Sequence, residues 1–325
     1  MIKISLILIL IFLASSTALL AQDETVVKTD SSIIRTKYFK ELNSIRVFNE
    51  LKNQYKSYFT DYYYKPKSVR EKGVFFHNEC YSIWKEFWPN GKLKREVNYT
   101  TGVLNYFDKK AYPFYDYQLS VKLKADAIIK RVYSEEFFKK YLVWDIQHSF
   151  IYNDQLSGDW KDNLGVTPEK FLIRYAIKFG GKTYPEIIEL QLDKKGRFIS
   201  GERTNGLEKL PPNTKKSFML TPEKAIILAK QKGLVESSKK PAEAYLTWED
   251  DDKPGTIYNG HFRVYVVVNS SSKKTVSSYG RSTVINKYDV CVFNPWSGAL
   301  ITKKGMHSIT GWEEGSGSST GLIPD

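Results

Sequence analysis

The pattern of apolar and polar positions is clearest in residues 218–234, where it predicts a complete α-helix. Thr221 is placed to cap the first amides, Pro222 suits the first helical position, and Gly233 suits a left-handed residue at the end. Residues 225–229 are all apolar and form a broad face, which is typical of a helix packed on a sheet.

Alternation of apolar and polar residues predicts β-strands on both sides of this helix. The two clearest strand faces carry bulky apolar residues at every second position: Phe171, Ile173, Tyr175, Ile177 and Phe179 in one, and Phe262, Val264, Val266 and Val268 in the other. A predicted hairpin follows each strand, around Gly196 in the first case and Gly298 in the second. We therefore expect both strands to lie in antiparallel sheets.

The same order of features occurs twice along the chain. The tripeptide Ala-Ile-Ile at residues 127–129, in a helix expected over residues 117–132, recurs at residues 225–227. A strand opening with Tyr-Leu-Val-Trp at residues 141–144 recurs as Tyr-Leu-Thr-Trp at residues 245–248. Two related modules, each a helix followed by strands, explain this order, and segregated helices and strands predict the α+β class.

The N-terminal third of the chain predicts a helix and then a hairpin. Apolar residues recur close to helical spacing between Tyr38 and Tyr58. In residues 81–104, aromatic and aliphatic strands flank Asn90 and Gly91, which accept the positive φ values of a type I′ turn.

The predicted fold class is α+β, with two tandem helix-plus-antiparallel-sheet modules after an N-terminal helix and β-hairpin. The expected segments are a signal peptide at 1–21, a mobile leader at 22–36, the helix and hairpin at 37–110, a first module at 111–215, a second module at 216–308, and a flexible Gly/Ser-rich tail at 309–325.

The first residues predict export. Lys3 precedes an unbroken apolar run at residues 6–14, and Ala18 and Ala21 are small residues suited to cleavage. The run is well short of the roughly 20 apolar residues that a membrane-spanning helix needs, and no later segment comes closer. We therefore expect a secreted or periplasmic protein without a transmembrane segment.

The charge of the chain favours anionic partners. The formal net charge is +13, and it becomes +12 after removal of the signal segment, whose one charged residue is Lys3. The densest basic stretch, residues 52–72, interleaves Tyr and Phe with Lys and Arg, a composition that can stack on nucleic-acid bases. Aromatic side chains packed inward are the simpler interpretation, so nucleic acid is not expected as the partner, whereas weak contact with anionic polymers is.

The two cysteines do not form a disulfide scaffold. Cys80 and Cys291 are far apart in the sequence, and both a buried thiol at Cys291 and a bridge between the two remain open. His77 and Cys80 could be read as base and nucleophile, but on a strand they would point to opposite faces. His148 has the spacing of a hydrogen-bonded core histidine on a strand face.

Other candidate sites are also weak. His261 and His307 are isolated, and no pair of histidines has the spacing of zinc ligands. The acidic run at residues 249–252 lacks the alternating ligands and glycine of a calcium loop. Ser319 lies in a Gly-x-Ser-x-Gly sequence without the strand and helix of a nucleophile elbow. We therefore predict no catalytic, cofactor-binding or metal-binding residue, and no cofactor.

Two stretches resemble known families. Residues 81–104, an aromatic strand, then Pro-Asn-Gly-Lys-Leu, then a strand, resemble one MORN-like repeat of bacterial exported proteins, which implies no activity by itself. The second module resembles the PepSY family at Thr221, Glu223, Ala225, Ala229, Tyr288, Val290, Val292, Gly298 and Leu300, and over about residues 117–305 the chain resembles two diverged copies. Asn294 in place of a common acidic residue, and the Ser/Lys-rich loop at 269–281, depart from that pattern.

The PepSY resemblance implies an exported module that binds or restrains another protein without doing chemistry. We therefore predict a non-catalytic binding or inhibitory module of the bacterial cell envelope, whose partner is another envelope or secreted protein. The alternative is an envelope hydrolase with an unrecognised active site, and a third interpretation is a structural protein held on anionic polymer. Strongly shifted titratable groups in one deep pocket would favour the enzyme, whereas a shallow surface and an open sheet edge would favour the binding protein.

Overall fold

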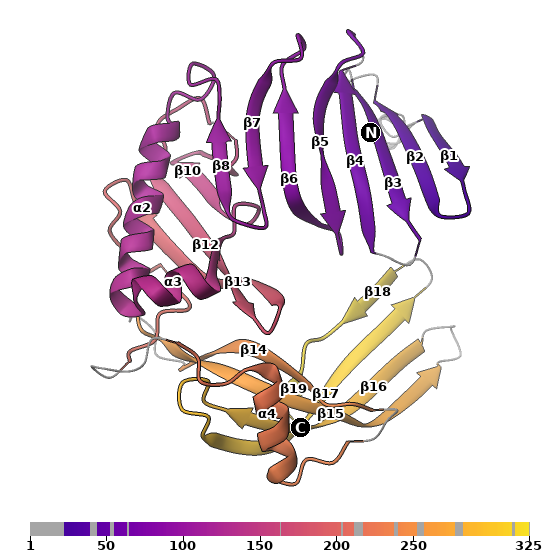
Figure 1. The fold of residues 1–325 in the computed structure, drawn as a ribbon, viewed down its shortest axis with the longest axis vertical. Coiled ribbons are helices and arrows are strands. Elements are labelled where there is room, and N and C mark those ends of the chain that lie inside the picture. Colours follow the sequence, from indigo (N-terminus) through magenta and orange to yellow (C-terminus); the bar gives the residue numbers. More distant parts are fainter. Residues whose placement is uncertain are drawn as a thin grey trace, which may run out of the picture. The chain divides into compact units, whose positions relative to one another are not determined.

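The computed structural model describes residues 23–324, except for 40–43, 53–54, 64, 163, 203, 211–216, 237–239, 252–256, 277–281 and 314–315. The chain forms two compact units, unit 1 (Met1–Tyr115) and unit 2 (Asp116–Asp325). The structure is mostly antiparallel sheet, with 54% strand and 13% helix (Figure 1). The predicted α+β class, with tandem helix-plus-sheet modules after an N-terminal helix, is therefore wrong. The predicted signal peptide lies outside the described residues.

The described residues of unit 1 form an eight-stranded antiparallel sheet in which each strand pairs with its neighbours in the sequence (Figure 1). Across the sheet the strands are β1 (Asp23–Lys28), β2 (Ser32–Phe39), β3 (Ser44–Leu51), β4 (Lys56–Tyr63), β5 (Val69–Phe76), β6 (Glu79–Phe87), β7 (Leu93–Asn98) and β8 (Val103–Tyr106). The strands β1 and β2 lie where a mobile leader was expected.

The predicted helix at residues 38–58 is replaced by the end of β2, all of β3 and the start of β4. The spacing of apolar residues in this stretch fits a helix, but β-branched and aromatic residues fit a sheet surface better. Phe48 lies opposite Phe59 on the neighbouring strand, with ring centroids 5.2 Å apart. Such cross-strand contacts outweigh the local spacing, because they bury side chains that an isolated helix would leave exposed.

The predicted hairpin at residues 81–104 is confirmed by β6 and β7, but its turn type is not. The amide of Gly91 donates to the carbonyl of Trp88 at 2.8 Å, and Gly91 alone has a positive φ in this turn, +79°. Pro89 suits the second position of a type I turn, so the hairpin closes by a type I turn with a glycine bulge. The turn with two positive φ values joins β5 to β6, at His77 and Asn78.

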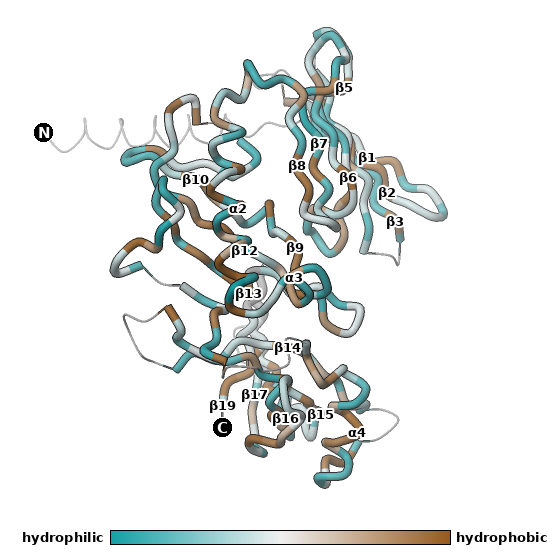
Figure 2. The backbone as a smooth tube through the Cα atoms, turned by 60° about the vertical axis from the view of Figure 1, so that its left-hand side comes forward, coloured by the Kyte–Doolittle hydropathy of each residue, from teal (hydrophilic) through white to brown (hydrophobic). Residues whose placement is uncertain are grey.

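Unit 2 begins with two helices beside a five-stranded antiparallel sheet (Figures 1 and 2). The helices are α2 (Tyr115–Val132) and α3 (Glu135–Tyr141); the strands are β9 (Leu142–Trp144), β10 (Phe150–Asn153), β11 (Leu156–Asp159), β12 (Lys170–Phe179) and β13 (Lys182–Asp193). The predicted apolar face of β12 is confirmed as buried at Phe171, Ile173 and Tyr175, but Leu172 and Ala176 between these positions are buried as well. The hydroxyl of Tyr175 donates to Asp126 Oδ1 on α2 at 2.5 Å and joins helix to sheet.

The rest of unit 2 is helix α4 (Pro222–Gln231) with a six-stranded sheet. The strands are β14 (Glu243–Asp250), β15 (Gly260–Val276), β16 (Ser282–Phe293), β17 (Leu300–Glu313), β18 (Ser316–Ser319) and β19 (Ile323–Pro324). The helix is confirmed with its ends: Thr221 caps it, and Gly233 has φ +90°. The segment expected to be a flexible tail contains β18 and β19, which pair with β17.

Candidate binding surface

One face of the unit 1 sheet carries exposed aromatic and aliphatic side chains among lysines. The strand register places Tyr58 opposite Val74, and Val74 opposite Tyr81, so all three share this face. We call it the aromatic–lysine face and define it by eight residues: Lys56, Tyr58, Lys72, Phe76, Tyr81, Ile83, Lys85 and Val103. Its apolar members are between 41% and 47% exposed, a large fraction for such side chains.

Two of the three lysines of this face lie beside aromatic rings, and the third, Lys85, has its Nζ 3.2 Å from Glu96 Oε2 on the neighbouring strand. Lys56 Nζ is 5.1 Å from the ring centroid of Tyr58, and Lys72 Nζ is 5.6 Å from that of Phe87. Phe76 and Tyr81 have ring centroids 5.6 Å apart across β5 and β6. The face therefore presents flat apolar rings with positively charged groups within about 6 Å of them.

An aromatic stack continues the face at the end of the hairpin between β5 and β6. The rings of Tyr55 and His77 are nearly parallel, at 17°, with centroids 4.7 Å apart, and Phe76 meets His77 edge-on at 4.5 Å. Tyr55 is 75% exposed and has φ +47°, and His77 has φ +51°. Left-handed backbone at a non-glycine residue costs of order 1 kcal/mol, so the sheet holds this exposed stack at some expense in stability.

The opposite face of the same sheet is a covered core. Phe59 stacks on Trp84 with centroids 5.3 Å apart, and Phe75 meets Trp84 edge-on at 4.9 Å. The indole of Trp84 lies directly over Gly73, where a Cβ atom would be only 2.1 Å from Trp84 Cδ2. Trp84 Nε1 donates to the carbonyl of Val74 at 2.9 Å, which fixes the ring.

A row of ion pairs borders this core. Asp61, buried on β4, contacts the guanidinium of Arg70 and lies 3.8 Å from Nε of Arg46. Burial raises the pKa of Asp61, and the two guanidinium groups partly oppose that effect. On β6 and β7, Glu86 lies 2.5 Å from both Lys94 Nζ and Arg95 Nε. Asp61 and Glu86 are thus ion-paired with cations on neighbouring strands, and these pairs stabilise the sheet.

His261 in unit 2 has acids as its neighbours. Its Nδ1 is 2.7 Å from Glu208 Oε1 and its Nε2 is 3.3 Å from Asp251 Oδ2. Glu208 is buried; it also accepts from Trp296 Nε1 at 2.6 Å, and its amide donates to the hydroxyl of Tyr133 at 2.8 Å. The polar contacts of His261 thus lead to carboxylates rather than to a hydroxyl or thiol nucleophile, and the cluster joins five separate segments of the chain.

His148 lies in the turn after β9 rather than on the strand face expected for it. Its Nδ1 is 3.0 Å from both carboxylate oxygens of Asp145. The adjacent Ser149 Oγ donates to the carbonyl of Asp145 at 2.7 Å and accepts from Trp144 Nε1 at 3.1 Å and from the amide of Arg174 at 3.0 Å. These bonds give Ser149 a structural role in the turn and not the geometry of a nucleophile.

The other sequence candidates are separated from one another. His77 lies in a turn and stacks on Tyr55, whereas Cys80 lies on the covered face of β6 and hydrogen-bonds with Tyr99, which supports no base and nucleophile pair. Cys80 and Cys291 are not joined in a disulfide. Glu249 binds Arg263 and the hydroxyl of Tyr265. Among the described residues, no group of three His, Cys, Asp or Glu could hold a metal ion.

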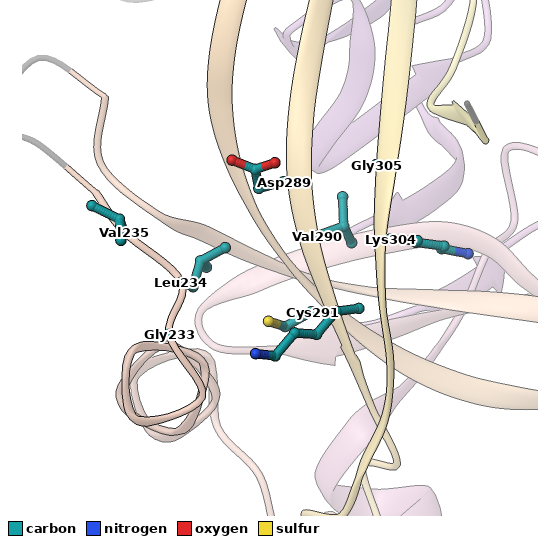
Figure 3. A pocket seen from close by; sticks show the side chains of 9 residues that line it. Gly233, Leu234, Val235, Asp289, Val290, Cys291, Lys304 and Gly305 are labelled. Atoms are coloured by element: carbon teal, nitrogen blue, oxygen red, sulfur yellow. The ribbon is translucent and has the colours of Figure 1, made fainter.

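A cleft of about 370 Å³ lies between the end of α4 and the sheet (Figure 3). Burial raises the pKa of Cys291 in its wall, and Lys303 partly opposes that effect, so the thiol stays protonated at neutral pH. Lys303 Nζ donates to the carbonyl of Lys232 and stabilises the end of the helix. Burial raises the pKa values of Tyr133 and Tyr175 well above their usual value, but these fully buried residues do not line this cleft.

Sequence reasoning found part of the aromatic–lysine face and missed the rest. The basic aromatic stretch at residues 52–72 contains Lys56, Tyr58 and Lys72, but alternate residues of that stretch point into the covered core. None of the helices in the described ranges has the length and apolarity that crossing a membrane requires. Comparison with protein families, with curated proteins and with solved structures found no match to this chain.

Proposed function

We propose that the protein is a non-catalytic binding protein that acts in the cell envelope after export, and that the aromatic–lysine face is its contact surface. The observation that carries the proposal is the exposure of Tyr58, Phe76, Tyr81 and Ile83 on one face with Lys56, Lys72 and Lys85. Large exposed apolar patches mark interaction sites in soluble proteins, and Lys56 and Lys72 on this face favour an anionic partner. The face also carries two acids, because Glu79 lies opposite Phe76 and Glu96 lies opposite Lys85.

An acidic polysaccharide fits this surface best. Exposed aromatic rings stack on the flat C–H faces of sugar rings, and lysines pair with carboxylate or phosphate groups along the same polymer. Lys56 and Lys72 lie on adjacent strands, which are about 4.8 Å apart, and Lys85 lies on the next strand, where it already pairs with Glu96. Lys56 and Lys72 can therefore contact a polymer laid across the sheet. The parallel stack of Tyr55 on His77 extends the platform at its end. The net positive charge of the chain would speed the encounter.

Binding assays with three polymers test the proposal. We expect the purified protein to bind a polyuronate, to bind a neutral glucan of equal length more weakly, and to bind polyglutamate, which has charge without sugar rings, more weakly as well. Affinity for the polyuronate should fall as salt rises from 50 to 300 mM, because the Debye length at 0.1 M is about 10 Å and exposed charges are screened.

Variants separate the two parts of the surface. Tyr81→Leu, which removes the ring and keeps apolar area, should weaken polyuronate binding about tenfold, or about 1.4 kcal/mol, and Tyr81→Phe should restore it. Lys56→Ala should weaken it a few fold, whereas Lys178→Ala, an exposed lysine on β12 in unit 2, is the matched control and should have no effect. Equal affinity for polyglutamate and polyuronate, or a protein ligand that resists these variants, would contradict the proposal.

A further inference from the structure

Strand β1 is the outer edge of the unit 1 sheet, and its backbone groups are presented to solvent. In the described residues β1 pairs with β2 alone, and residues 24–30 are all exposed. The amide of Thr29 donates to the carbonyl of Ser32 at 2.9 Å, and the register runs from there through Val27 opposite Ile34. Because hydrogen bonding alternates along an antiparallel strand, Glu24, Val26 and Lys28 point their N–H and C=O groups away from β2.

An edge of this kind is a template for another strand, and natural edges are usually blunted. The described part of β1 has no proline and no bulge, and its middle is Thr-Val-Val. Val26 is 44% exposed and Val27 is 56% exposed. The charges of the strand lie at its two ends, with Asp23 and Glu24 at one end and Lys28 at the other. An incoming strand that neutralises these ends would therefore pair best.

A second copy of β1 has the required charges. Two identical antiparallel strands form hydrogen bonds only in registers that place outward residues opposite outward residues. Two such registers overlap over most of the strand. In one, Thr25 lies opposite Thr25 of the second copy; in the other, Val26 lies opposite Val26 of the second copy. The first register leaves Glu24 opposite Val26. The second places Glu24 of each copy opposite Lys28 of the other, which forms two equivalent ion pairs.

We propose that two copies of the protein associate through β1, antiparallel, with Val26 of each copy facing Val26 of the other on a two-fold axis. Each of the outward residues Glu24, Val26 and Lys28 then donates and accepts a hydrogen bond across the axis. Thr25 of one copy faces Val27 of the other. The contact is small compared with the 1,200–2,000 Å² of stable interfaces, so the dimer is reversible and its population depends on concentration.

This association is independent of the proposed function, although it would place two aromatic–lysine faces on one continuous sheet. Glu24 already lies 3.7 Å from Arg35 on β2, and pairing with Lys28 of the second copy adds a cation on its other side. The isologous geometry closes the assembly at two copies, because each β1 edge is used once.

Sedimentation velocity of the protein purified after export, with its N-terminus determined by mass spectrometry, tests the proposal. We expect a monomer–dimer equilibrium that shifts toward dimer as concentration rises. Glu24→Lys alone and Lys28→Glu alone should weaken dimerisation at least tenfold, because each places like charges opposite each other. A mixture of the two single variants should restore the dimer, as should the double exchange in one chain, and this restoration controls for the loss of the Arg35 contact.

Backbone pairing and register have their own tests. Val26→Pro should abolish the dimer and leave the monomer folded, because proline removes an N–H that points to solvent in the monomer. Val26→Cys should form an intermolecular disulfide on mild oxidation, since opposed Cα atoms in such a pair are about 5.5 Å apart. Thr25→Cys should not, because its counterpart is diagonal at about 7–8 Å. A concentration-independent monomer, a dimer that survives Val26→Pro, or faster cross-linking of Thr25→Cys would overturn the proposal.

Discussion

Units 1 and 2 exclude water from their apolar side chains in different ways. In unit 2, α3 packs on β9 and β12 and α4 packs on β14 and β15, and residues such as Tyr133, Ile173 and Phe262 are completely buried. In unit 1 the described residues form one sheet whose own large side chains cover one face, and Phe59 and Trp84 retain 7% and 6% exposure. A helix packed on a sheet excludes water from the side chains beneath it completely, whereas a single layer of aromatic side chains leaves them slightly exposed.

The different packing of the two units also decides which sheet surface stays exposed for binding. A sheet covered on one face by its own side chains keeps the other face available, and in unit 1 that other face is the aromatic–lysine face. The strands of unit 2 give more of their surface to packing, since Phe262, Val264 and Val266 on one side of β15 and Tyr265 and Val267 on the other are all buried. The comparison therefore predicts that substitutions in unit 2 damage stability, and that substitutions on the open face of unit 1 damage binding.

The largest expected effect tests the sealed core. Phe262 contacts the rings of Trp248 at 5.0 Å, Phe218 at 5.7 Å and Tyr133 at 5.9 Å. Phe262→Ala should lower the free energy of unfolding of unit 2 by about 3–5 kcal/mol, because it leaves a cavity that rigid neighbours cannot fill. Denaturant unfolding followed by tryptophan fluorescence measures the loss. Phe59→Ala in unit 1 is the counterpart and should cost less; an equal or larger loss there would break the comparison.

The next effect tests the thin cover of unit 1. Gly73→Ala would put a methyl group into the indole of Trp84, which lies over that glycine. Displacing the indole should lower the free energy of unfolding by about 1–3 kcal/mol and change the near-ultraviolet circular dichroism of the protein. Gly321→Ala, with nothing within 4 Å of the added Cβ, is the matched control and should be neutral. An unchanged spectrum for Gly73→Ala would show that the indole is not fixed there.

A smaller effect concerns the start of α4. Thr221 Oγ1 accepts from the amide of Lys224 at 3.4 Å and satisfies one of the first helical donors. Thr221→Ala should cost about 1 kcal/mol in unfolding free energy, and Thr221→Ser should recover most of it, because serine caps equally well. If serine and alanine destabilise the protein equally, the hydroxyl is not the cap and packing of the methyl group matters instead.

The smallest effect is a dependence on pH at Asp61. Burial raises its pKa in the folded protein above 3.8, the value for the unfolded chain, so its contribution to stability is greatest below pH 3.8 and is lost as pH rises through the folded pKa. Asp61→Asn lacks this loss, so its unfolding free energy relative to the wild type should increase with rising pH and then level off.

Asp193 gives the opposite sign. Burial opposes ionisation there too, but amide and guanidinium hydrogen bonds from Arg197 and Lys195 lower its pKa below 3.8. Asp193→Asn should therefore lose stability relative to the wild type as pH rises through the interval below 3.8. Parallel curves for the two variants between pH 2 and 7 would contradict the assignment of burial as the dominant effect at Asp61.

Local signals in the sequence predicted local structure well. Helix α4 was predicted with its cap and its end, because Thr221, Pro222 and Gly233 act within one turn of where they stand. The alternation along β12 and β15 also predicted buried faces, since a strand of period two needs no knowledge of its partner. The position of the turn after Trp88 was predicted correctly, but its type was not. The Asn-Gly pair predicted a type I′ turn, whereas Pro89 before it favours the type I turn that the structure has.

Features that depend on pairing could not be predicted. Residues 38–58 fit helical spacing, and only their partners in β2 to β5 make them strands. The Gly/Ser-rich composition after residue 309 suggested a flexible tail, yet β18 and β19 are held by the backbone of β17, which composition does not encode. The aromatic–lysine face joins Tyr58 to Tyr81 and Ile83 through strand register, so no single stretch of sequence contains it.

The topology of unit 1 has a consequence for how that sheet is made. Because β1 to β8 pair in sequence order, each new hairpin has its partner in place as soon as the preceding strand exists. Such a sheet closes only short loops, which makes its formation fast compared with unit 2, where β9 must wait for β12. It can also gain or lose a hairpin at either end without changing how the remaining strands pair. The width of the sheet can therefore change by small insertions or deletions while its topology stays the same.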